Sequence, residues 1–237
     1  MPRGSPNLSG QARSENDSSG GNDLIPARRT RETEVKIRID NASALCARLK
    51  QLGFRRIHPR ALEDNVLFDT PDRALRRARC LVRIREYGSR WTVTYKGTPD
   101  PDRFFKSRIE LESQVDNPEA MRAILFKLGM HPVFRYQKYR AEFALGEQRR
   151  SRKPTLEVAL LEIALDETPI GDYIELEGSR RSIDRGARAL GYSRSDYITA
   201  SYGALYLEDC VRRKKPPTDM VFRKSPRRNL RKKRAGG

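Results

Sequence analysis

Charged side chains of both signs recur at every second position along several short segments of the chain. The clearest segment alternates Glu32, Glu34 and Lys36 with Val35 and Ile37. Successive side chains of a β-strand point to opposite faces, so this spacing predicts a strand with one charged and one apolar face. Cations that converge from such faces could hold a polyanion, and carboxylates could hold a metal ion.

The same charged alternation returns further along the chain, in segments 83–85, 94–96, 108–112, 138–142 and 175–177. One such strand would be expected on a solvated sheet surface. A whole series is better explained by a closed barrel that places the charged faces around a shared interior. Unpaired charges in a dry interior would be costly, so this interior is expected to be a wet tunnel. We therefore expect a mainly β (α+β) fold: a closed antiparallel β-barrel tunnel with a charged interior and helices packed outside.

An ordered set of motifs extends from residue 30 to about residue 208. It begins with Glu32-x-Glu34-x-Lys36, which is weak evidence by itself. It continues through segments 68–72, 83–85, 91–96, 110–112, 138–140, 165–167 and 171–177. The full set resembles the CYTH domain, or triphosphate tunnel metalloenzyme, family, which includes class IV adenylate cyclases, thiamine triphosphatases and inorganic triphosphatases. One departure is Ala200 before Ser201 and Tyr202, where the family often has a basic residue.

The candidate phosphate-binding residues are Lys and Arg side chains spaced two apart on the expected strands. Guanidinium groups bind phosphate oxygens in pairs, and Lys supplies a point charge. The alternative is ordinary surface charge, which the shared strand parity disfavours. We expect catalytic roles in phosphate binding and charge neutralisation for Lys36, Arg83, Arg85, Lys96, Lys138 and Arg140, with Arg38 and Arg108 as further substrate-binding residues.

The candidate metal ligands are carboxylates on the same strand faces. The chain has only two histidines, His58 and His131, which excludes a His-rich zinc or iron site, and oxygen donors favour Mg²⁺ or Mn²⁺. The alternative role is ion pairing with neighbouring cations, and Glu110 suits that role as well as ligation. The expected metal ligands are Glu32, Glu34, Glu112, Asp166, Glu175 and Glu177.

Positive charge is unevenly distributed along the 237 residues, whose net charge is +18. Residues 211–237 contain twelve Lys or Arg and one Asp, whereas residues 1–28 contain three Arg and three acidic residues. We expect a disordered segment at 1–28, one tunnel domain at 29–210 and a disordered basic tail at 211–237. Such a tail can contact a polyanion, either nucleic acid or polyphosphate, through counterion release.

Several classes of protein are disfavoured. The mean hydropathy is −0.78, and we find no membrane-length apolar run and no signal peptide, so no membrane association is expected. Cys46, Cys80 and Cys210 are odd in number and far apart, which suits neither a disulfide framework nor a zinc site and favours the cytoplasm. No phosphate-binding glycine motif and no nucleophile–histidine arrangement is present.

The helices expected outside the barrel suggest an internal duplication. Leu52-Gly53 and Leu128-Gly129 each end an amphipathic helix that follows a charged strand and precedes another strand. The first helix has a cap at Asn41 or Ser43, and the second begins at 117–119. Because Leu-Gly is common at helix ends, chance is the alternative. Further expected elements include a strand at 64–69 and a last helix at about 195–209.

Three functions stay open. The first is metal-dependent hydrolysis of tripolyphosphate, thiamine triphosphate or ATP. The second is cyclisation of ATP to cyclic AMP and pyrophosphate, and the third is non-catalytic binding of polyphosphate or nucleic acid. Hydrolysis is placed first because cyclisation also requires the ribose 3′-hydroxyl to be held in line with the α-phosphorus. The carboxylates disfavour a pure anion binder, and a homodimer is left open.

Overall fold

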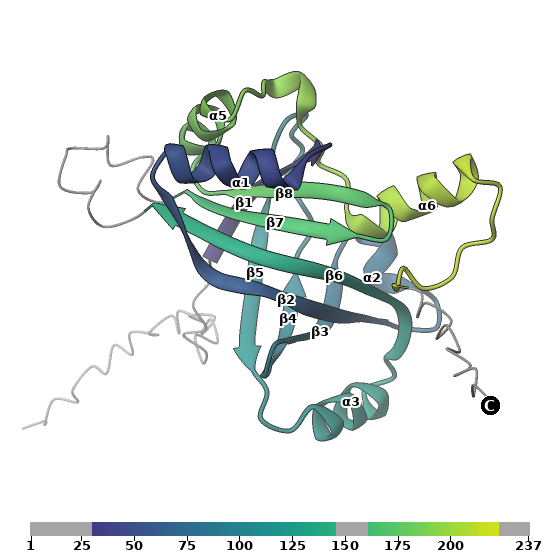
Figure 1. Cartoon of the computed structure of the whole chain (residues 1–237). Coiled ribbons are helices and arrows are strands. Elements are labelled where there is room, and N and C mark those ends of the chain that lie inside the picture. The colour runs from purple at the N-terminus through teal and green to yellow at the C-terminus, as the bar shows by residue number, and fades with distance from the viewer. Residues whose placement is uncertain (1–29, 146–160, 223–237) are drawn as a thin grey trace, which may run out of the picture.

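A closed β-barrel forms the centre of the molecule (Figure 1). The computed structural model describes residues 30–145 and 161–222. Within these ranges, eight antiparallel strands close in the order β1-β5-β4-β3-β2-β6-β7-β8, which confirms the predicted fold class. The strands are β1 (Thr30–Ile39), β2 (Phe54–Asp69), β3 (Leu81–Tyr87), β4 (Arg90–Lys96), β5 (Lys106–Gln114), β6 (His131–Leu145), β7 (Glu162–Thr168) and β8 (Gly171–Glu177).

Helices lie on the outside of the barrel (Figure 1). They are α1 (Ala42–Gln51), α2 (Ala74–Arg77), α3 (Pro118–Lys127), α5 (Arg180–Ala189), the 3₁₀ turn η1 (Arg194–Asp196) and α6 (Tyr202–Arg212). Helix α5 contacts β8 and β1, and α1 contacts β2. Among the described residues, none of the helices has the length and apolar character needed to span a membrane.

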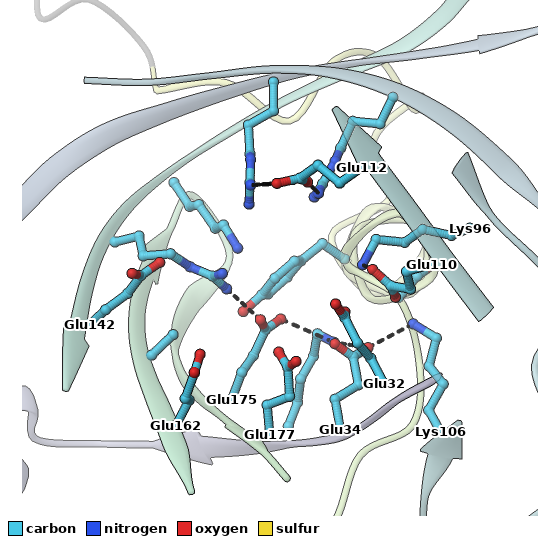
Figure 2. Close-up of a pocket in the computed structure, with 18 of the residues that line it drawn as sticks. Glu32, Glu34, Lys96, Lys106, Glu110, Glu112, Glu142, Glu162, Glu175 and Glu177 are labelled. Carbon is cyan, nitrogen blue, oxygen red and sulfur yellow. Dashed lines mark hydrogen bonds and ion pairs between the residues drawn. The ribbon is translucent and has the colours of Figure 1, made fainter. Parts of the chain in front are cut away.

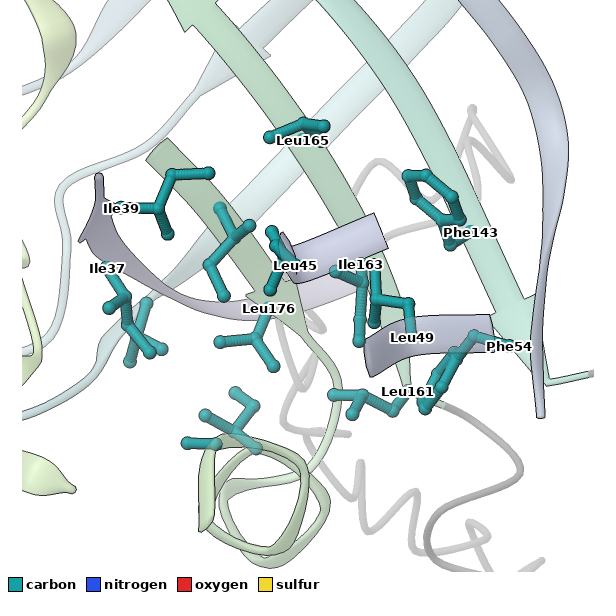
Figure 3. Close-up of a cluster of buried hydrophobic side chains, with 14 of the residues drawn as sticks. Ile37, Ile39, Leu45, Leu49, Phe54, Phe143, Leu161, Ile163, Leu165 and Leu176 are labelled. Carbon is teal, nitrogen blue, oxygen red and sulfur yellow. The ribbon is translucent and has the colours of Figure 1, made fainter. Parts of the chain in front are cut away.

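The apolar core lies between the outer face of the barrel and the covering helices (Figure 3). Ile37 of β1, Ile163 of β7 and Leu176 of β8 pack there against Leu45 and Leu49 of α1. Burying a side chain of this size contributes about 1.5–3 kcal/mol. Because the apolar positions of each strand face outward, the alternate charged positions face the interior of the barrel.

The two halves of the chain have the same plan, which supports the predicted duplication. Asn41 caps α1 and Asn117 caps α3, each accepting a backbone N–H at 2.9 Å. Gly53 and Gly129 follow the helix ends with φ of 90° and 80°, a region that favours glycine. Exchanging β1–β4 with β5–β8 reproduces the same cyclic strand order.

Two expected elements differ from the structure. Strand β2 begins at Phe54 rather than at residue 64, because it pairs with β6 along its whole length with two irregularities between Arg56 and Ala61. The single helix expected at 195–209 is instead η1 followed by α6. Ile198 lies between them in a bridge to Lys36, so the backbone is extended there.

The prediction of a disordered basic tail is wrong for residues 211–222. Helix α6 continues to Arg212, and Met220 is completely buried against the barrel. Its backbone pairs with β6, which a disordered segment would not do. Residues 223–237, like the N-terminal segment 1–28, lie outside the described residues.

Candidate active site

The barrel encloses a cavity of about 330 Å³ (Figure 2). Its charged side chains come from β1 and from β3 to β8, while β2 contributes the apolar Ile57 and Leu67. The charged lining residues are Glu32, Glu34, Lys36, Arg83, Arg85, Lys96, Lys106, Arg108, Glu110, Glu112, Lys138, Arg140, Glu142, Glu162, Glu175 and Glu177. The structure thus brings together every candidate residue predicted from the sequence except Arg38 and Asp166.

Arg38 lies outside this cavity. Its side chain is exposed, and its guanidinium carbon is 5.9 Å from the centre of the Tyr173 ring. Parity on β1 places Arg38 on the same face as Lys36, but Arg38 is only one residue from the end of the strand. Spacing of two residues predicts the face of a strand and cannot predict how far along the strand the cavity extends.

Asp166 lies beneath the cavity lining. It is completely buried, and its carboxylate is 3.0 Å from Lys138 Nζ and accepts a 2.7 Å hydrogen bond from Arg140. The Tyr202 hydroxyl donates to the same carboxylate at 2.6 Å. Asp166 is therefore positioned to hold two cations, and its oxygens are engaged by these neighbours.

Glu63 is an important residue that the sequence analysis missed. It is completely buried on β2, 3.4 Å from Lys138 Nζ and 3.6 Å from Arg140 Nε, and Asn65 Nδ2 donates to it at 3.1 Å. Glu63 and Asn65 are polar residues spaced two apart, the same spacing as in the charged pairs of the other strands. That signal was lost because the predicted strand began at residue 64.

Lys106 was also missed, although its parity on β5 matches Arg108, Glu110 and Glu112. Its ammonium group donates to Glu34 at 2.9 Å. Burial, opposed in part by Glu34, lowers the pKa of Lys106 to about 8. Glu142 and Glu162 also line the cavity, and of the two only Glu142 lies in a segment whose charged alternation is visible in the sequence.

One wall of the cavity is acidic. Glu34 and Glu177 are direct partners across β1 and β8, as are Lys36 and Glu175, so these side chains meet on one surface (Figure 2). Lys36 Nζ lies 3.1 Å from both Glu34 and Glu175. Arg140 also pairs with Glu175. The four carboxylates on β1 and β8, from Glu32, Glu34, Glu175 and Glu177, therefore outnumber the one cation, Lys36, on this wall.

Crowding of the carboxylates changes their proton affinity. Burial, a hydrogen bond with Glu110 and the charge of Glu177 raise the pKa of Glu32 to about 8. Burial and the charges of Glu34 and Glu162 raise the pKa of Glu177 to about 7. Burial together with mutual repulsion identifies a place where an added cation would be stabilised.

Other carboxylates on the same wall are held ionised. Burial alone would raise the pKa of Glu34, but the charges of Lys106 and Lys36 hold it well below its usual range. Glu175 shows the same balance, with burial opposed by Lys36, Lys138 and Arg140. The wall therefore combines ionised carboxylates with neighbours that hold protons near neutral pH.

The donor chemistry of this wall suits a divalent metal ion. Mg²⁺ and Mn²⁺ prefer carboxylate oxygens, and Glu32, Glu34, Glu175 and Glu177 supply them from two adjacent strands. In the side-chain conformations observed for the described residues, no three carboxylate, imidazole or thiol groups form a ready-made ligand cluster. The acidic wall therefore suits a divalent metal ion in its charge and in the type of its donor atoms.

The opposite wall is basic. In the barrel order β3 lies across from β8, and β3 carries Arg83 and Arg85. Arg85 pairs with Glu112 at 2.9 Å, on the side of the cavity away from Glu34 and Glu177 (Figure 2). Arg83 donates to Thr94 at 3.3 Å, while its buried Nε has no hydrogen-bond partner. An anion between the walls would meet these guanidinium groups and the acidic wall together.

Comparisons with known proteins agree with this geometry. A family model described as the CYTH domain matches residues 30–202. A Methanocaldococcus jannaschii protein named "Putative adenylate cyclase" is 30% identical over 181 residues, covering 72% of this chain and 95% of that protein.

Solved structures share the fold. A "putative adenylate cyclase" from Vibrio parahaemolyticus matches with a TM-score of 0.60 at 21% identity, covering 73% of this chain and 96% of the other. A Hippeastrum "putative adenylyl cyclase", described as having a dominant triphosphatase activity, matches with a TM-score of 0.52 at 20% identity, covering 78% and 97%. The match of the family model over residues 30–202, together with the charged barrel, shows that the chain belongs to the CYTH domain family.

Proposed function

We propose that the protein is a divalent-metal-dependent triphosphatase that cleaves a phosphoanhydride bond of a short triphosphate inside the barrel. The observation that carries this proposal is the cavity in which a basic wall on β3 faces an acidic wall on β1 and β8. A triphosphate is a multiply charged anion that normally carries a metal ion, so it needs both kinds of group.

The basic residues would bind the phosphates and neutralise charge as it develops. Arg83 and Arg85 can each contact phosphate oxygens in pairs, while Lys36, Lys96, Lys138 and Arg140 supply further positive charge. Glu32, Glu34, Glu175 and Glu177 would hold Mg²⁺ or Mn²⁺, which polarises a phosphoryl oxygen when bound. Hydrolysis uses water as the nucleophile and does not require a ribose to be held, which is why hydrolysis is placed first.

Cyclisation of ATP is the second candidate. It is supported by the name of the Methanocaldococcus jannaschii relative, whereas the description of the Hippeastrum structure supports triphosphatase activity. The reaction requires a ribose held in line with the α-phosphorus, an arrangement that can contribute several kcal/mol. No residue of the described cavity lining is assigned that role by its contacts, so cyclisation stays second.

Product analysis separates the candidates. The purified protein is incubated with tripolyphosphate, thiamine triphosphate or ATP in the presence of Mg²⁺ or Mn²⁺, and the products are separated by chromatography. Orthophosphate from tripolyphosphate, without cyclic AMP from ATP, is the expected result. Cyclic AMP and pyrophosphate as main products would reverse the order, and tight binding without turnover of any substrate would favour a binding module.

A further inference from the structure

The described chain continues beyond the family match at residue 202 and returns to the barrel. Strand β6 pairs with β2 along its whole length, but with β7 only from Tyr139 to Phe143. The first half of β6 therefore has one edge without a strand partner from β7. Residues 218–222, here called the C-terminal strap, lie along this edge, where Met220 forms a parallel bridge with Tyr136.

Several bonds hold the strap on β6. The Met220 N–H donates to the Arg135 carbonyl at 3.0 Å, and the Gln137 N–H donates to the Met220 carbonyl at 2.8 Å. The Asp219 carboxylate accepts the Arg135 N–H at 2.9 Å. The Phe222 ring lies 5.1 Å from that of Tyr139. These bonds satisfy backbone groups of an otherwise open sheet edge.

The strap also reaches the cavity lining through packing. Met220 has no exposed surface and belongs to a buried cluster with Tyr136, Tyr202, Ile170 and Tyr173. Tyr136 and Tyr202 both line the cavity. A side chain without exposed surface is surrounded by close packing, so removing it would leave a void beside these rings.

Both tyrosines contact groups that the proposed function uses. Arg83 donates to the Tyr136 hydroxyl at 3.4 Å. The Tyr202 ring lies 5.2 Å below Lys36 Nζ and 5.0 Å below Lys138 Nζ, and its hydroxyl donates to Asp166. The positions of three cations on the cavity wall thus depend on two rings that pack with Met220.

We propose that the C-terminal strap is a positioning element of the triphosphate site, in which Met220 fixes the Tyr136 and Tyr202 rings that support Arg83, Lys36 and Lys138. This inference rests on the proposed function, since it concerns how the same site holds phosphate. Met220 itself does not line the cavity, so its effect on catalysis is transmitted through the tyrosines.

The test compares substitutions at Met220 with a matched loss of an apolar side chain elsewhere. Met220→Ala removes the packing, Met220→Leu restores most of its volume, and Val211→Ala is the control, because Val211 is 80% exposed on α6. KM and kcat for tripolyphosphate are measured with Mn²⁺, and hydrogen exchange at the Gln137 amide reports whether the strap is seated. Phe222→Ala, which loosens the strap at its end, replaces Met220→Ala if that variant does not fold.

We expect Met220→Ala to raise KM about tenfold with a smaller change in kcat, and to speed exchange at Gln137, because small misplacements of binding groups are costly. Met220→Leu should restore both values, and Val211→Ala should change neither. Unchanged KM in Met220→Ala, or in its substitute Phe222→Ala, despite faster exchange at Gln137 would overturn the inference.

A pair of truncated chains gives an independent test of the C-terminal strap. Ending the chain after Phe222 removes only residues 223–237, whereas ending it after Lys215 also removes the strap. The shorter chain should show the higher KM, and equal values would contradict a positioning role. If the wild-type protein neither binds nor cleaves tripolyphosphate, the proposed function fails first, so the two failures are distinguishable.

Discussion

Some charged residues of the barrel line the cavity, and others are buried and hold the lining residues in place. Lys138 belongs to the first group and pairs with two members of the second. Its ammonium group lines the cavity and lies 3.0 Å from Asp166 and 3.4 Å from Glu63, both completely buried. Removing one partner of a buried ion pair leaves an uncompensated charge, which costs about 3–5 kcal/mol.

Lys138→Ala should therefore lower the free energy of unfolding by about 3–5 kcal/mol. Urea denaturation measures this loss, with the exposed Lys127→Ala of α3 as the control. A loss below about 1 kcal/mol, as for a surface ion pair, would contradict the buried network.

Arg85→Ala should separate binding from stability, because its partner Glu112 is 39% exposed. The expected effect is weaker binding of tripolyphosphate by about 1.5–3 kcal/mol, the value of a charge-assisted hydrogen bond. Calorimetry measures the affinity. Wild-type affinity in a folded Arg85→Ala protein would remove Arg85 from the phosphate site.

Two carboxylates of the acidic wall predict how stability depends on pH. On folding, the pKa of Glu32 rises from 4.5 to about 8, and the pKa of Glu177 rises from 4.5 to about 7. At a pH between the unfolded and the folded pKa of each group, the folded protein therefore binds more protons than the unfolded chain. The free energy of unfolding should then fall as pH rises from about 5 to about 8.

Glu32→Gln and Glu177→Gln should each flatten this dependence, because glutamine does not titrate. Urea denaturation at pH 5.5 and 7.5 measures the slope, with the exposed Glu119→Gln of α3 as the control. Wild-type slopes in both variants would show that these carboxylates ionise normally in the folded protein.

At the scale of elements, the packing of α5 against the barrel requires a close approach of the helix backbone to the strands. A Cβ atom on Gly186 of α5 would clash with Leu161 Cδ2 and lie 3.4 Å from Leu176 Cδ2, and both leucines are almost completely buried. Leu176 neighbours Glu175 and Glu177 on β8, so α5 packs behind the acidic wall.

Gly186→Ala should destabilise the protein by about 1–3 kcal/mol, the usual cost of overpacking, in spite of the better helix propensity of alanine. Gly203→Ala is the control, since its nearest contact would be an ordinary 3.5 Å. Thermal denaturation compares the two. Equal melting temperatures would mean that Leu161 moves aside without cost.

Strand alternation also explains what the sequence could predict about the elements. The charged faces of β1, β3 and β8 followed directly from spacing of two residues. The same rule could not separate Glu175, which lines the cavity, from Asp166, which lies beneath it, because depth depends on neighbouring strands. The part of β2 before residue 64, which includes Glu63, was missed because irregular pairing near His58 interrupts the pattern.

At the scale of the whole molecule, closure of the barrel was predictable because a series of charged faces needs a shared interior. The C-terminal strap was not predictable. Met220 begins a run of only three apolar residues, 220–222, in a basic, proline-containing stretch, without a period that indicates a strand. Its burial results from the open edge of β6, a property of strand pairing that local sequence does not report.

In the proposed function, the cavity processes a triphosphate with the help of a divalent metal ion. The most direct test measures orthophosphate release from tripolyphosphate while Mn²⁺ is titrated, in the wild-type protein, in Glu177→Gln and in the double variant Arg83→Ala/Arg85→Ala. Release that requires Mn²⁺ in the wild type, needs more Mn²⁺ in Glu177→Gln and is lost in the arginine variant is the predicted result. Release that is independent of metal, or that persists unchanged in both folded variants, would contradict the account.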